Sequence, residues 1–187
     1  MDAIRNKDCY TYEEYCKLGD GIQQELIDGT LVTVNSDDFP EHQSVLIALF
    51  KILSTFLDGK AGRVFSAPIK VRLNANDYSE TVVQPDILVI CDEKKLLNGT
   101  EIISPPDLIV EVLSPSSSRH DRITKFKLYN KAAVREYWIV DPIDKTVIVY
   151  VLHGNKYAVN AYESKDSVPV NMLDGCVVNL SEVFTDI

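Results

Sequence analysis

The spacing of hydrophobic residues predicts a long amphipathic helix in the first third of the chain. From Glu41 to Leu57, apolar residues recur three and four positions apart, and Asp58-Gly59 then ends the pattern. A short capped helix is expected over Thr11 to Leu18. Between these helices, Gln23 to Val34 alternates between apolar and polar residues around an Asp-Gly turn, which predicts a hairpin.

The rest of the chain alternates between short apolar runs and one further helix. A helix is expected from Ser117 to Ala133, and the tail from Lys156 to Ile187 predicts a further strand or two and a terminal turn. The predicted strands are Arg63 to Leu73, Val82 to Cys91, Leu108 to Leu113, Glu136 to Val140 and Thr146 to Leu152. This order favours an α/β fold, in which a central sheet carries a helix on each side. No repeat or long linker divides the sequence, so we expect a single domain over residues 1–187.

Composition agrees with an ordinary globular domain. The chain has 187 residues, of which 45% are hydrophobic and 25% charged, and this size supports a core without disulfides. Charges interrupt the N-terminal segment every few residues, so we expect no signal peptide, no membrane span and a cytoplasmic location. The four cysteines are scattered without zinc-site spacing, and we interpret them as reduced thiols.

The net charge bears directly on which partners are possible. A formal charge of −9 predicts repulsion from a polyanion, whereas most nucleic-acid-binding proteins are basic. The basic residues are unevenly distributed, however, and six basic or histidine side chains fall between Arg119 and Lys131. Clustered carboxylates also lower the net charge until cations bind them.

Two carboxylates interrupt apolar strands. Asp86 follows Gln84-Pro85 and begins the run Ile-Leu-Val-Ile, whereas Glu111 is the single polar residue of Leu108 to Leu113. An ionised carboxylate is rarely buried without a partner or a metal. A structural ion pair explains either residue alone about as well as a functional site does.

Lys125 provides a third candidate. On a helical wheel at about 100° per residue with Ile123 at zero, Lys125 falls at about 200°, inside the apolar arc and on the same face as Asp121. Its ammonium is therefore expected to point toward the sheet. The alternative is a lysine that buries its methylene groups and extends its charge into solvent.

Two carboxylates and a lysine suit phosphodiester hydrolysis. Carboxylate oxygens bind Mg²⁺ or Mn²⁺, which lowers the pKa of a bound water and neutralises charge on the phosphate. The lysine can orient or deprotonate the attacking water and stabilise developing negative charge.

Several motifs, in order along nearly the whole chain, resemble those of the Uma-type restriction endonuclease family within the PD-(D/E)XK nuclease superfamily. They are Glu25-Leu-Ile-Asp-Gly29, His42, Gln84-Pro-Asp-Ile87, Pro106 to Pro115, Asp121 with Lys125 and Tyr129, and Glu136-Tyr-Trp-Ile-Val-Asp-Pro142. The last three together are specific to the family, whereas Pro-Asp alone carries no weight.

The resemblance implies a restriction-endonuclease-like αβββαβ core with a mixed central sheet, a DNA substrate and a homodimer. It implies that Asp86 and Glu111 bind the metal, that the backbone carbonyl of Val112 adds a ligand, and that Glu25 is a peripheral acidic catalytic group. In the wider superfamily the lysine stands two residues after the strand glutamate, at the position of Leu113, so Lys125 would reach the site from the following helix.

Smaller features of the resemblance concern single positions. Ala133 stands where the family often has glycine, and we expect this difference to alter the end of a helix rather than the site. His42 could touch the substrate, although a histidine at a helix end is more often a packing residue. Tyr137 and Trp138 alternate between the faces of a strand and are expected in the core.

Two other functions remain open. A nuclease fold that has lost catalysis could act as a binding or regulatory module, which the acidic net charge favours. Alternatively, the polar strand residues could form internal salt bridges in a purely structural oligomer. Metal binding separates the nuclease from both alternatives.

Overall fold

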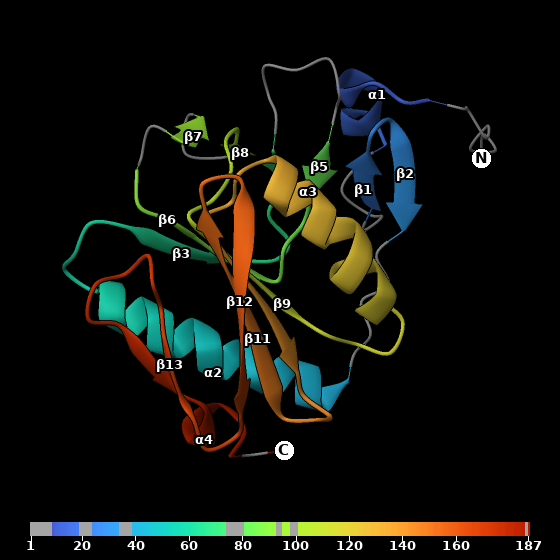
Figure 1. Cartoon of the computed structure of the whole chain (residues 1–187). Helices are drawn as coiled ribbons and strands as arrows, with labels where there is room; N and C mark the ends of the chain where they lie inside the picture. Colours follow the sequence, from blue (N-terminus) through green and yellow to red (C-terminus); the bar gives the residue numbers. More distant parts are fainter. Residues whose placement is uncertain are drawn as a thin grey trace.

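The computed structural model describes residues 9–18, 24–33, 39–73, 81–92, 95–97, 101–185 and 187. Its largest element is a six-stranded central sheet with the strand order β12-β11-β10-β9-β6-β3 (Figure 1). The bounds of its strands are β3 Arg63–Ser66, β6 Ile87–Ile90, β9 Leu108–Val112, β10 Glu136–Asp141, β11 Thr146–His153 and β12 Lys156–Glu163. Strands β9 and β10 are parallel and every other neighbouring pair is antiparallel, so the sheet is mixed.

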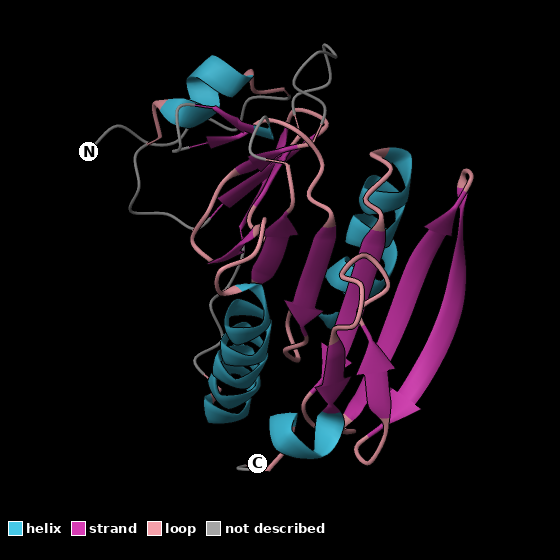
Figure 2. Cartoon of the chain, turned by 90° about the vertical axis from the view of Figure 1, so that its left-hand side faces the viewer, coloured by secondary structure: helices cyan, strands magenta, loops and turns pink. Residues whose placement is uncertain are grey.

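Helices cover both faces of this sheet, as expected. Helix α2 (Pro40–Leu57) packs on one face together with α4 (Leu180–Val183), and the second helical segment, which ends with α3 (Phe126–Lys131), packs on the other. Figure 2 shows the two long helices on opposite sides of the strands. The order α2, β3, β6, β9, α3, β10 confirms the predicted αβββαβ core.

The alternation of side chains along the strands creates two separate hydrophobic cores. In β9, Leu108, Val110 and Val112 face α2, whereas Ile109 faces α3. In β10, Trp138 faces α2 and Tyr137 faces α3, and both are fully buried. The expectation that these two aromatic residues belong to the core is therefore confirmed.

A second six-stranded sheet, of order β2-β1-β5-β4-β8-β7, was not predicted. Its strands are β1 Gln24–Ile27, β2 Thr30–Thr33, β4 Val71–Arg72, β5 Val82–Val83, β7 Leu96–Leu97 and β8 Glu101–Ile102. The predicted continuous strands 63–73 and 82–91 were wrong, because each divides between the two sheets. The segment between Cys91 and Leu108, for which no strand was predicted, contains β7 and β8. Pro68 and Pro85 lie at the two divisions, where a residue without an N–H interrupts the ladder.

The local predictions near the N-terminus are confirmed. Helix α1 (Tyr12–Cys16) begins at Thr11, whose hydroxyl accepts from the Glu14 N–H while the Glu14 carboxylate accepts from the Thr11 N–H. The β1–β2 hairpin turns at Asp28 and Gly29, whose φ angles of 46° and 80° are those of a type I′ turn.

The C-terminal segment contains β13 (Ser167–Pro169), β14 (Val177–Asn179) and α4, which complete the core beside α2. All four cysteines are free. No helix in the described ranges combines the length and the hydrophobicity needed to cross a lipid bilayer.

Candidate active site

Strands β6 and β9 bring Asp86 and Glu111 to the same end of the central sheet. Asp86 directly precedes β6, and the antiparallel register pairs Ile87 with Val110. The Val112 N–H donates to Asp86 Oδ2 at 2.8 Å, which joins the two segments. Glu111 lies between Ile109 and Leu113 on the face toward α3, where it is 2% exposed. The predicted pair therefore meets in space.

Lys125 reaches Glu111 from a helical segment with an irregular turn. Residues His120–Lys125 form a π-helical turn, labelled η2, immediately before α3. Such turns insert an extra residue into a helix and are frequent at functional sites. Asp121, Lys125 and Tyr129 are all buried along this segment, as the wheel predicted for the first two. The Lys125 Nζ lies 2.9 Å from Glu111 Oε1 and 3.4 Å from Asp121 Oδ1.

Glu25 contacts the same lysine from the second sheet. Glu25 comes from β1 in the second sheet and is fully buried. Its Oε1 accepts from the Gln84 N–H at 2.9 Å and lies 3.3 Å from Lys125 Nζ, while its Oε2 lies 3.0 Å from His120 Nε2. Glu25 thus connects the second sheet to the lysine.

The cluster holds more negative than positive charge. Burial and the neighbouring carboxylates Asp121, Asp86 and Glu25 raise the pKa of Glu111 well above its ordinary value, although Lys125 opposes this shift. The pKa of Asp121 is also raised, mainly by burial. Glu25 differs: burial would raise its pKa, but Lys125, His120 and the Gln84 N–H together lower it.

Lys125 is held as a cation. Burial opposes its charge, but Glu111, Glu25, Asp121 and Asp86 outweigh burial and raise the pKa of Lys125 well above its ordinary value. The ammonium therefore neutralises part of the carboxylate cluster at neutral pH.

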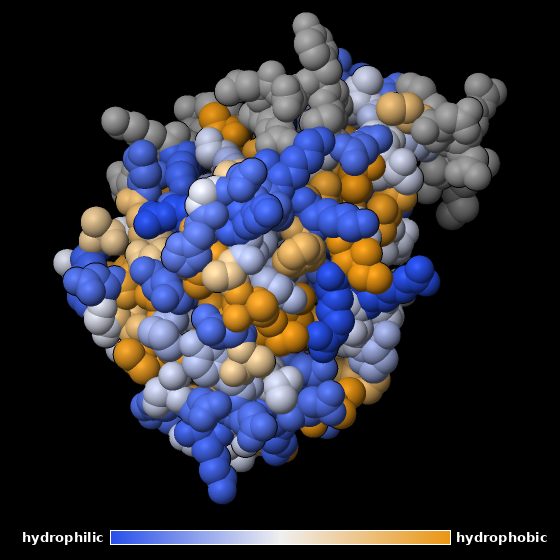
Figure 3. Space-filling model, in the orientation of Figure 1, coloured by the Kyte–Doolittle hydropathy of each residue, from blue (hydrophilic) through white to orange (hydrophobic). Residues whose placement is uncertain are grey.

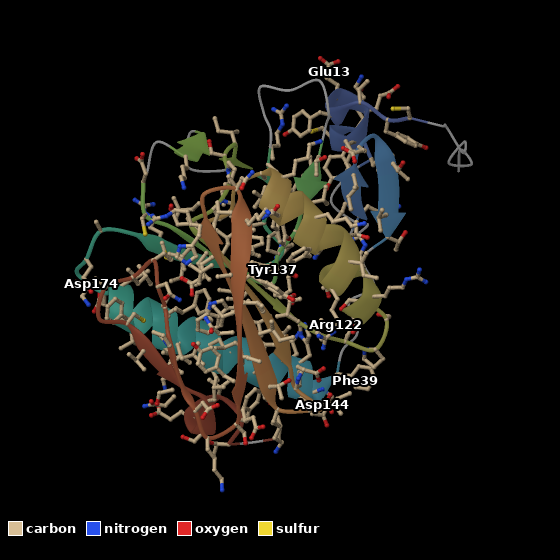
Figure 4. All side chains as sticks on the ribbon, in the orientation of Figure 1. Glu13, Phe39, Arg122, Tyr137, Asp144 and Asp174 are labelled. Atoms are coloured by element: carbon tan, nitrogen blue, oxygen red, sulfur yellow. The ribbon has the colours of Figure 1, made fainter. Side chains whose placement is uncertain are left out.

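Sequence reasoning did not assign roles to two tyrosines that complete the inner wall of the site. The Tyr129 hydroxyl donates to Glu111 Oε1 at 2.6 Å, and the Tyr137 hydroxyl donates to the Asp121 carbonyl at 3.1 Å. Tyr137 is labelled near the centre of Figure 4. The four-residue spacing of Lys125 and Tyr129 on one helical face was the available signal for Tyr129.

Two histidines also join the site. His42 Nε2 lies 3.3 Å from Asp86 Oδ2, and its Nδ1 is buried without a hydrogen-bond partner. Burial lowers the pKa of His42, but Asp86 and the backbone of Val112 outweigh burial and raise it overall. His120 pairs with Glu25 as described above, and no sequence pattern indicated its role. The side chain of Asp86 is 21% exposed and that of His42 is 13% exposed, so this end of the cluster is open to solvent.

The acidic side chains of the cluster suit a cation that keeps part of its water shell. In the parts of the chain that the structure describes, no three His, Cys, Asp or Glu side chains are arranged to hold a metal by themselves. Mg²⁺ does not require such a set, because it usually keeps several waters and is bound through one or two carboxylates together with substrate phosphate. The partly exposed Asp86 carboxylate and the neighbouring carboxylates that raise the pKa of Glu111 are compatible with a cation nearby. The buried Asp121 Oδ1 makes no hydrogen bond and lies 3.4 Å from the Lys125 ammonium.

Comparison with known proteins places the chain in a family. The family model Uma2, described as a putative restriction endonuclease, matches residues 10–181. Two uncharacterized proteins of Synechocystis sp. are also similar. The first, slr1290, is 28% identical over 68% of this chain and 65% of its own length, so the chain spans less than two thirds of it. The second, sll1609, is 25% identical over 72% of this chain and 75% of its own length.

A solved structure supports the fold. It is a putative nuclease belonging to DUF820 from Anabaena variabilis, and it superposes with a TM-score of 0.75 over 94% of this chain and 97% of its own. The sequences are 20% identical, so this likeness bears on the fold alone. Since the family model matches nearly the whole chain, the protein belongs to the Uma2 family of putative restriction endonucleases.

Proposed function

We propose that this protein is an endonuclease that hydrolyses DNA phosphodiester bonds with Mg²⁺ or Mn²⁺ as its cofactor. The observation that carries the proposal is the buried Lys125–Glu111 ion pair at 2.9 Å beside the partly exposed Asp86. Family membership supports a nuclease. The sequence around these residues also resembles the motifs of PD-(D/E)XK nucleases. We infer a cytoplasmic location, because DNA is the substrate and the four cysteines are free thiols.

Asp86, Glu111 and the backbone carbonyl of Val112 are the groups that would hold the cation. A divalent cation there would supply positive charge to the phosphate and lower the pKa of a water molecule. Asp86 is the most accessible of the three acidic side chains assigned to the site, since Glu25 and Glu111 are nearly fully buried. The substrate phosphate would therefore approach from the Asp86 and His42 end.

Lys125 would act as a cation rather than as a base. In the cation-free site its raised pKa keeps the ammonium protonated at neutral pH, and a protonated lysine cannot accept a proton from water. A fixed positive charge can instead orient the attacking water and stabilise the charge that develops on the phosphate oxygens. Glu25 and Asp121 hold the ammonium in place from two further elements.

A binding module without catalysis is the second candidate. Lys125 already contacts three carboxylates, and the chain carries a net charge of −9. Both facts are compatible with a cluster whose charges stabilise the fold and with a DNA or protein ligand that is bound but not cleaved.

The test combines calorimetric titration of Mg²⁺ and Mn²⁺ with a plasmid-nicking assay. The variants are Asp86→Asn, Glu111→Gln and Lys125→Met. Asp174→Asn and Lys127→Met serve as controls, because both residues are exposed and lie outside the cluster. Circular dichroism verifies that each variant is folded.

We expect the wild type and both controls to bind the cation and nick the plasmid. Asp86→Asn and Glu111→Gln should lose cation affinity, whereas folded Lys125→Met should keep it and lose nicking by at least about a hundredfold. If the wild type binds the plasmid but does not nick it at any of the cation concentrations, the result would support the binding module. A wild type that binds neither cation nor DNA would leave only the structural ion-pair cluster.

A further inference from the structure

Strand β12 forms a long free edge of the central sheet. Its eight residues pair with β11 in an uninterrupted register, and no other strand in the described ranges pairs with it. Residues 158–161 are all exposed, and Val159 is 59% exposed. In Figure 1 this strand lies at the front of the molecule, and in Figure 2 the β11–β12 hairpin lies at the right-hand margin.

This edge lacks the features that normally prevent strands from associating. Exposed edges are usually protected by proline, by a bulge or by charged side chains in the middle of the strand. The sequence of β12, KYAVNAYE, has no proline, and its charges lie only at the two ends, Lys156 and Glu163. The space-filling view in Figure 3 shows hydrophobic surface near the middle of the same face. The strand is therefore suited to pair with another strand.

Hydrogen bonds at the end of β12 identify the residues whose backbone groups face away from β11. The Glu163 N–H donates to Asp166 Oδ2 at 2.8 Å, and the Asp166 N–H donates to the Glu163 carbonyl at 2.9 Å. The backbone of Glu163 therefore does not bond to β11. Because orientation alternates along an antiparallel strand, the backbone groups of Tyr157, Val159 and Ala161 face outward in the same way.

These three residues are arranged symmetrically about Val159. In an antiparallel pairing, a residue with outward backbone groups must lie opposite another such residue, because the two residues exchange their N–H and C=O hydrogen bonds. A pairing centred on Val159 places Val159 opposite itself and Tyr157 opposite Ala161 on both sides, and no like charges meet. A register shifted toward Glu163 would compete with the hydrogen bonds that Asp166 already makes.

We propose that two copies of this chain associate through β12 in this register and join their central sheets into one continuous sheet. A two-fold contact of this kind uses the same patch on both subunits. The inference goes beyond the proposed nuclease function and does not depend on it. It assigns the subunit interface to a specific strand edge.

The test measures association by sedimentation velocity from micromolar to millimolar protein. Val159→Lys and Val159→Glu place a charge where the residue faces its own copy. Val177→Lys is the matched control, because Val177 is an exposed valine (51%) on β14, in a groove of about 760 Å³ beside α2. Circular dichroism confirms that each variant is folded.

We expect the wild type and Val177→Lys to dimerise equally, and each Val159 variant alone to stay monomeric. An equimolar mixture of Val159→Lys and Val159→Glu should form a heterodimer, because opposite charges then face each other at the two-fold axis. A monomeric wild type at all concentrations overturns the proposal, and so does undiminished dimerisation of Val159→Lys. If the mixture fails to associate, the register centred on Val159 is refuted. If Val177→Lys is the single variant that loses the dimer, the interface lies in the groove beside α2 and the proposal is wrong.

Discussion

Replacing Lys125 with methionine should destabilise the fold, and the loss should depend on pH. The substitution keeps a long apolar side chain but removes the ammonium that lies 2.9, 3.3 and 3.4 Å from Glu111, Glu25 and Asp121. All three carboxylates are buried, so none can be solvated in place of the lost partner without rearrangement. The variant must either keep these three carboxylates charged without their partner, which lowers the stability of the fold, or bind protons at one or more of them.

The expected magnitude follows from the cost of breaking a buried ion pair. Removal of one partner typically costs about 3–5 kcal/mol because the other charge stays buried and uncompensated. The pKa of Glu111 is raised by burial and by its acidic neighbours even while Lys125 opposes the shift, so it should rise further in the variant. The folded variant then binds more protons than the unfolded chain above about pH 4.3, the ordinary value for Glu. Its stability should therefore fall as pH rises toward neutral.

Urea unfolding with a chelator present tests this reasoning. At about pH 8 we expect Lys125→Met to lose about 3–5 kcal/mol relative to the wild type, and at about pH 5 a clearly smaller amount. The control Lys127→Met, which alters an exposed lysine in α3, should change stability by less than about 0.5 kcal/mol. The charge argument would be refuted if Lys125→Met and the wild type were equally stable at the higher pH. It would also be refuted if the loss of stability in the variant did not change with pH.

Three further predictions concern single residues. Ala133 has a φ of 57°, a conformation that glycine adopts more easily than alanine. Ala133→Gly should therefore raise the free energy of unfolding by about 0.5–1 kcal/mol in urea denaturation. A lower free energy of unfolding would contradict the strain at this helix end. Glu136 is fully buried and accepts hydrogen bonds from Trp138 Nε1 at 2.7 Å and from the Met172 N–H at 3.0 Å. Glu136→Ala leaves both donors without a partner, so it should lower the free energy of unfolding by at least about 3 kcal/mol, which a fall in the melting temperature would show. Glu25→Gln should cost about 1.5–3 kcal/mol at neutral pH. Because the pKa of Glu25 is lowered on folding, this stability is present above its unfolded pKa and is lost as pH falls through the folded value, so acid titration of both proteins should bring their stabilities together.

Local patterns predicted most of the helices and strands but not how the strands divide between the two sheets. The α1 capping box, the Asp28-Gly29 turn and the long helix α2 depend on residues a few positions apart, and all three are present. The predicted strands 63–73 and 82–91 each divide between two sheets. The partners of β4 and β5 come from distant segments, and hydrophobic periodicity carries no information about such partners.

The sequence by itself determined which candidate side chains face the interior. Glu111 was the single polar residue in an apolar strand, and Lys125 shared the apolar face of its helix, because periods of two and 3.6 residues define the faces of strands and helices. Both residues are buried as these patterns indicate.

Only the tertiary structure decided what those side chains contact. Glu25 and Lys125 are 100 positions apart in the chain, yet the second sheet places them 3.3 Å apart, and His42 from α2 meets Asp86 in the same way. The side-chain contacts that raise the pKa of Lys125 also depend on this packing. Periodicity determines the face on which a residue lies, whereas long-range strand pairing and helix packing determine its neighbours, and electrostatic interactions depend on the distances to those neighbours.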